Sequence, residues 1–172
     1  LFFFMNFKFY LEKLHNSEKF KEFIRENKEA YLCSGFFILD KTEKGDKSHL
    51  DFYVPSKEKM FSFQLEDGIK LVPVEIFDKK IPEKISDNSD FNFEDMENLI
   101  NYRMEKENIK NKTQKIMFSL QKSKGSEFLI GTVFISMMGL LKVNIDITNK
   151  KITNFEKKSF LDMMNITGKK KS

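Results

Sequence analysis

Alternation of apolar and polar residues near the C-terminal end constrains the fold of this chain more than any other feature. From Leu141 to Ile147, every second residue is apolar and the residues between are polar (Leu141, Val143, Ile145 and Ile147 against Lys142, Asn144 and Asp146). A strand of this kind buries one face and exposes the other to solvent, which is typical of an antiparallel sheet covered on one side. A parallel doubly wound sheet would need a helix between successive strands, and no helical period separates them here.

Amphipathic helices precede two groups of such strands. Apolar residues at helical spacing predict one bent helix or two short helices between residues 7 and 26, with Ser17 as an N-cap. Three- and four-residue spacing predicts another helix from about Phe93 to Asn108. The resulting order is helix, strands, linker, helix, strands, which is an α+β arrangement of two helix-plus-antiparallel-meander units in one compact protein.

Three or four strands are expected in the first unit, the fourth being a candidate, and four in the second (31–39, 49–54, 60–65 and the candidate 69–77, then 115–121, 128–136, 140–147 and 152–155). Pro73 predicts an edge position for the fourth strand, because proline cannot donate to a central ladder. We expect units at 1–80 and 91–165, a linker at 81–90 and a basic tail at 166–172 containing Lys169, Lys170 and Lys171. A short helical turn is expected at 159–164, and Met5 could be the initiator in place of Leu1.

The composition favours a well-filled core and a reducing compartment. The chain has 172 residues, 20 of them phenylalanine, and a single cysteine. Phenylalanine burial is expected to fill the core without disulfides or metal, although some rings could line an exposed apolar groove. Cys33 lies within an apolar strand, so an inert core thiol is expected there. The longest uncharged run, Phe128–Leu141, is too short to span a bilayer, so no membrane span is expected.

The charge pattern does not favour nucleic-acid binding. The net charge is +4, but only Arg25 and Arg103 supply the guanidinium forks that suit phosphate and guanine contacts. Lysines supply the remaining positive charge, and this leaves a weak polyanion binder as an alternative function.

Few residue patterns point to catalysis. The chain has neither a dinucleotide-binding nor a P-loop glycine pattern, so no cofactor is expected. Asp46, His49 and Asp51 are the one set that could meet around a cation, since His49 and Asp51 share a strand face. We expect a solvated strand face there rather than a metal site, and a small metal-dependent enzyme using His49 and Asp51 remains the alternative.

The second unit resembles a PepSY-type domain, which is a helix followed by a meander. The resemblance rests on VNIDITNKKI, residues Val143 to Ile152, where Asp146 ends a strand and Ile152 resumes it. Asn149 stands where that family has a turn glycine. The order of segments also resembles that of small archaeal proteins. The resemblance implies a PepSY- or cystatin-like fold with an accessory or binding role and no catalysis.

Together these observations predict a cytoplasmic, non-enzymatic binding or interaction protein. The expected ligand is a peptide or an apolar molecule held on a sheet surface, because a sheet packed against helices leaves one face or edge for a partner.

Overall fold

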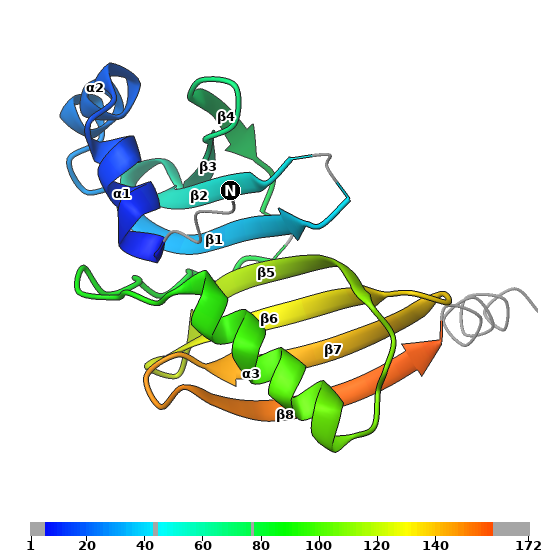
Figure 1. The fold of residues 1–172 in the computed structure, drawn as a ribbon. Coiled ribbons are helices and arrows are strands. Elements are labelled where there is room, and N and C mark those ends of the chain that lie inside the picture. Colours follow the sequence, from blue (N-terminus) through cyan, green and yellow to red (C-terminus); the bar gives the residue numbers. More distant parts are fainter. Residues whose placement is uncertain (1–5, 43–44, 77, 160–172) are drawn as a thin grey trace, which may run out of the picture.

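The computed structural model describes residues 6–42, 45–76 and 78–159, and it shows an α+β fold. Its helices lie on one side of a single eight-stranded antiparallel sheet (Figure 1). Several expectations concern residues outside the described ranges. They are the choice between Leu1 and Met5, residues 160–164 of the expected helical turn, the end of the second unit beyond Ser159, and the basic tail at 166–172. Ser159 itself ends a strand, so a helical turn does not begin there.

The helices begin at polar caps, as their sequences predict. Helix α1 spans Phe7–His15 and α2 spans Glu18–Glu26, so the N-terminal pattern forms two short helices. Ser17 caps α2, and its side chain accepts a hydrogen bond from the Phe20 amide at 3.2 Å. Helix α3 spans Phe93–Lys106 and is capped by Asn92.

The strands form two meanders that follow the helices in order. The first contains β1 (Tyr31–Asp40), β2 (Lys47–Val54), β3 (Lys59–Gln64) and β4 (Lys70–Val74), with a 3₁₀ helix, η1 (Pro55–Lys57), between β2 and β3. The second contains β5 (Thr113–Ser123), β6 (Ser126–Ile135), β7 (Gly139–Asp146) and β8 (Lys151–Ser159). The fourth-strand candidate of the first unit is present as β4, and the seven other expected strands are present too, with bounds shifted by a few residues.

One ladder joins the two meanders into a continuous sheet. The strand order is β4-β3-β2-β1-β5-β6-β7-β8, and β1 pairs antiparallel with β5, placing Phe37 opposite Phe118. Strand β4 lies at one edge, which confirms the position that Pro73 predicts. Strand β8 forms the other edge and contacts α3, where the Arg103 guanidinium lies 5.2 Å from the Phe155 ring centroid.

The core is aromatic and lies between the helices and one face of the sheet. Phe7, Phe37, Phe63, Phe93 and Phe118 are at most 2% exposed, and many of their rings meet edge to face. Phe37 lies at the centre, with ring centroids 6.0 Å from Phe7 and 4.8 Å from Phe93. The phenylalanine excess therefore fills the core, and contacts of this kind stabilise it beyond simple burial.

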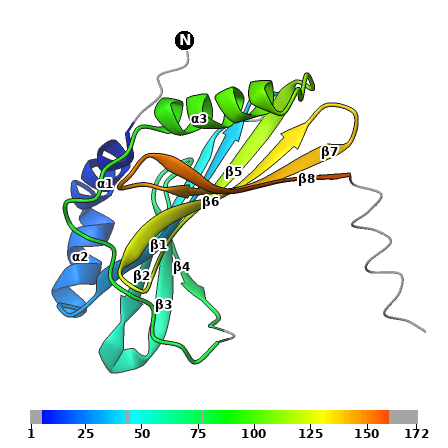
Figure 2. The ribbon, with the colours of Figure 1, turned by 90° about the horizontal axis from the view of Figure 1, so that it is seen from below.

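The segment between β4 and α3 has no regular secondary structure among its described residues and is anchored along its length. Ile85 is buried, and its amide donates to the Leu32 carbonyl at 2.9 Å. The Glu83 carboxylate accepts hydrogen bonds from the Lys124 and Gly125 amides at 2.8 and 3.0 Å. The predicted linker, 81–90, thus packs against both meanders. Figure 2 shows this segment passing below the ends of the strands.

Candidate functional site

The sheet face that turns away from all three helices, here called the open face, is the strongest candidate for a binding surface. The strand register places alternate residues of β1, β5 and β6 on it. Five apolar side chains on these strands are only half-buried and form what we call the apolar strip (Phe36, Ile38, Met117, Ile130 and Phe134). Figure 2 shows that none of the three helices covers this side of the sheet.

The register determines how the apolar strip is built. Ile38 in β1 lies opposite Met117 in β5. Two residues away along the strands, Ser119 in β5 lies between Phe36 in β1 and Ile130 in β6. Residues opposite each other in adjacent strands share a face and contact one another. Three neighbouring strands therefore contribute to one apolar surface.

Lysines border the apolar strip. Lys47 in β2 lies opposite Ile38 in β1, and Lys142 in β7 lies opposite Thr132 in β6. The Lys115 ammonium lies 4.9 Å from the Phe134 ring centroid, a cation–π distance. The surface therefore combines apolar contact area with positive charge at its margins.

The three residues predicted as the possible cation site have separate partners. The Nε2 atom of His49 lies 2.7 Å from Oε1 of Glu66, which is two residues after the end of β3. The Ser34 hydroxyl donates to Asp51 Oδ2 at 2.8 Å, and Asp46 Oδ1 accepts from the Asp40 amide at 3.0 Å. Within residues 6–42, 45–76 and 78–159, no group of three or more His, Cys, Asp or Glu side chains could hold a metal ion.

Glu66 is the partner of His49 that the sequence did not reveal. Partial burial raises the pKa of Glu66, but hydrogen bonds from His49 and from the Ser48 amide outweigh it and hold the pKa below its usual range. The register pairs His49 with Gln64, so the side chain two residues beyond Gln64 reaches the same face. In the sequence, Glu66-Asp67-Gly68 is typical of a turn, and this pattern does not indicate a partner for His49.

Cys33 is buried and unsuited to nucleophilic chemistry. Desolvation, followed by the nearby Asp51 carboxylate, raises the pKa of its thiol to about 12. Its Sγ atom donates to the Asp51 carbonyl at 3.4 Å where β1 shifts register between Leu32 and Ser34. At neutral pH almost no thiolate is present, so the thiol acts as a small apolar group.

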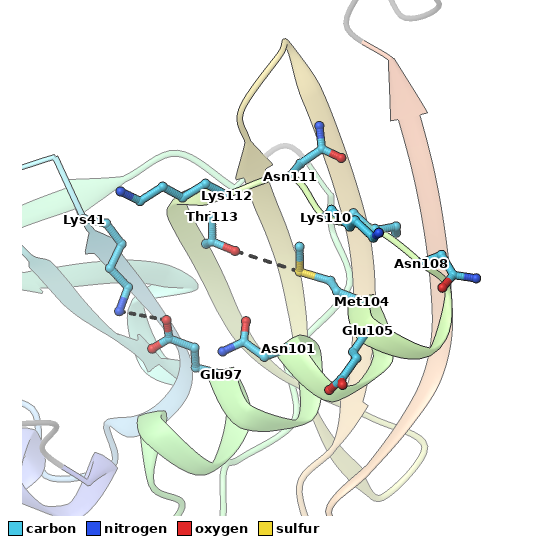
Figure 3. A pocket seen from close by; sticks show the side chains of 11 residues that line it. Lys41, Glu97, Asn101, Met104, Glu105, Asn108, Lys110, Asn111, Lys112 and Thr113 are labelled. Atoms are coloured by element: carbon cyan, nitrogen blue, oxygen red, sulfur yellow. Dashed lines mark hydrogen bonds and ion pairs between the residues drawn. The ribbon is translucent and has the colours of Figure 1, made fainter.

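A polar pocket of about 530 Å³ lies beside the C-terminal half of α3 and is shown in Figure 3. Two of its lining residues form an ion pair, Lys41 Nζ to Glu97 Oε1 at 2.7 Å, and the Glu97 side chain is only 10% exposed. Thr113 and Met104 also line it. The ion pair connects the loop after β1 to α3, so the pocket lies where the two meanders meet.

A smaller cavity, of about 320 Å³, lies between the N-terminal helices and the segment around Ile85. Leu11, Phe20 and Ile24 contribute apolar walls, and His15 stacks on Phe20 with ring centroids 4.9 Å apart. Burial lowers the pKa of His15, so its imidazole is neutral at physiological pH. This cavity is a second place where an apolar group could bind.

Comparison with known proteins identifies a similar fold. No protein-family model matches this sequence, and no curated protein matches it. The crystal structure of a putative lipoprotein from Clostridium difficile 630 is similar in fold, with a TM-score of 0.56 and 9% identity. The alignment covers 82% of this chain and 91% of that chain. At this identity the likeness shows the fold alone. Among the residues that the structure describes, no helix is both long and apolar enough to cross a membrane.

Proposed function

We propose that this chain is a non-enzymatic binding or interaction protein that holds a peptide or an apolar ligand on its open face. The observation that carries the proposal is the apolar strip, five half-buried apolar side chains on three adjacent strands. Apolar side chains gathered on an uncovered sheet face commonly mark an interaction surface. The bordering lysines favour a ligand that also carries negative charge.

The division of the chain into two PepSY-like units and its cellular location are also part of this proposal. We propose two PepSY-like helix-plus-meander units, 1–80 and 91–165, which meet at the β1–β5 ladder. The strand order supports this division, because each group of four strands is a simple meander. A cytoplasmic location is also proposed, and the free, buried Cys33 is compatible with a reducing compartment.

The edges of the sheet are weaker candidates for peptide binding. Pro73 removes one backbone donor from β4, and β8 carries Lys151, Lys157 and Lys158. Proline and lysine on edge strands are typical devices that prevent further strand addition. A partner is therefore expected to lie on the open face and not to extend the ladder.

The metal-dependent enzyme is the less favoured alternative, since His49 and Asp51 already pair with Glu66 and Ser34. A divalent-metal titration with a thermal-shift measurement tests it directly. Stabilisation that disappears in His49→Ala would support the enzyme, and no shift would dismiss it. Binding of polyanions through lysines is tested by the salt dependence of nucleic-acid retention.

Peptide selection tests the open face as a binding surface. A displayed random-peptide library is selected on the wild-type protein, and each peptide is then measured against Phe36→Ser/Met117→Ser. We expect selected peptides to combine apolar and acidic residues and to lose about tenfold or more in affinity for this variant, since two apolar anchors are removed.

Leu11→Ser, at the wall of the smaller cavity, is the matched control for that selection. It should bind the selected peptides as the wild type does. Peptides that bind both serine variants equally well, or a selection without enrichment on the wild type, would contradict the proposal.

A further inference from the structure

The hairpin between β6 and β7 ends in two exposed methionines. Met137 is 90% exposed and Met138 is 64% exposed. Both have a left-handed backbone, with φ of 63° and 57°. A left-handed backbone suits Gly and Asn and costs other residues conformational energy. Side chains so exposed recover little of that cost by packing within the described residues.

Lysines flank this tip on two sides. Ser136, which precedes Met137, is held by the loop after α3, because its amide donates to the Lys112 carbonyl at 2.8 Å and its hydroxyl accepts from the Lys112 amide at 2.9 Å. On the other side, β8 ends at the tip, and Leu140 pairs with Lys158.

Most of these lysine charges are not neutralised locally. Lys110, Lys112 and Lys157 are exposed, and none of them forms an ion pair with a carboxylate in the described part of the chain. Lys158 pairs with Glu156 at 3.5 Å. The two exposed methionines at this end of the molecule therefore have lysines on two sides.

We propose that the β6–β7 hairpin docks on an anionic lipid surface. Met137 and Met138 enter the boundary between headgroups and acyl chains, and the lysines face the headgroups. Two features favour a lipid surface over a groove on a protein. Lysine is a flexible point charge that suits diffuse headgroup charge, and methionine is a flexible apolar side chain without a fixed shape. This surface lies at the end of β6 and β7, next to Phe134, the member of the apolar strip nearest to the hairpin in sequence.

Vesicle sedimentation tests the proposal with variants that do not weaken the fold. We expect the full chain to sediment with vesicles of phosphatidylcholine and phosphatidylglycerol at low salt, and not with phosphatidylcholine alone. Met137→Asn/Met138→Gly should reduce the bound fraction about tenfold, because the apolar insertion is lost. The same variant should raise the thermal unfolding midpoint, since Asn and Gly tolerate the left-handed backbone at these two positions. Lys110→Glu/Lys112→Glu should also reduce binding about tenfold.

Two controls separate the tip from other sources of binding. Ile81, 67% exposed, lies near the opposite end of the strands, so Ile81→Ser should bind as the wild type does. Replacing Lys169, Lys170 and Lys171 with glutamine should leave the methionine dependence intact. The proposal is overturned if the wild type ignores anionic vesicles, if the Asn-Gly variant binds equally well, or if the lysine-tail variant alone abolishes binding.

Discussion

Replacing Phe37 with alanine is expected to lower the free energy of unfolding by about 3–5 kcal/mol, the range for a fully buried phenylalanine. Phe37 is 1% exposed and contacts rings from two segments that lie far apart in the chain, Phe7 in α1 and both Phe91 and Phe93 around the start of α3. It also lies in β1, the strand that joins the two meanders. A loss of this size is a large fraction of the stability of a small protein.

The neighbouring residue supplies the matched control. Phe36 has the same side chain and strand but lies half-buried on the open face, so Phe36→Ala should cost about 1 kcal/mol or less. Guanidinium unfolding followed by circular dichroism measures both variants, since the chain has no tryptophan to report by fluorescence. Equal losses for the two phenylalanines would show that the two faces are not divided as described.

The second large effect is expected at the ion pair between Lys41 and Glu97. Lys41→Met removes the cation 2.7 Å from a carboxylate whose side chain is 10% exposed. A buried charge left without its partner typically costs about 3–5 kcal/mol. The Lys41 side chain is 27% exposed, so water can partly reach the site and we expect about 2 kcal/mol.

A double-mutant cycle isolates this contribution from the other contacts of Lys41. Lys41→Met/Glu97→Leu replaces both charges with apolar groups and should recover most of the stability that Lys41→Met loses. Chemical unfolding of the wild type, both single variants and the double variant measures the coupling. Strictly additive losses would mean that the pair does not connect the loop after β1 to α3.

The sequence predicts the elements of this fold well because local patterns determine them. The alternation in residues 141–147 identifies β7, Ser17 marks the start of α2, and Pro73 places β4 at an edge. The β1–β5 ladder was not predicted, because pairing between strands far apart in the chain depends on the packing of both meanders. Whether the meanders share one sheet could be learned only from the structure.

The candidate site was harder to predict from the sequence, because it depends on the register between neighbouring strands. The alternation shows which residues of one strand share a face, but the apolar strip also needs the register that aligns Ile38 with Met117. The same limit applies to His49, whose partner Glu66 depends on the β2–β3 register. The sequence places a turn at 137–139, between the expected strands 128–136 and 140–147, but methionine rarely adopts a positive φ, so the left-handed backbone at Met137 and Met138 was not expected.

Methyl NMR tests the central claim most directly, because adjacent residues of the same strands point to opposite faces. A peptide selected on the wild type is titrated into protein labelled at methionine and isoleucine methyl groups. We predict shifts for Ile38, Met117 and Ile130 on the open face, and unchanged signals for the buried Ile100 and Ile116. Shifts confined to Met104, beside the polar pocket, or to the buried methyl groups would contradict the account.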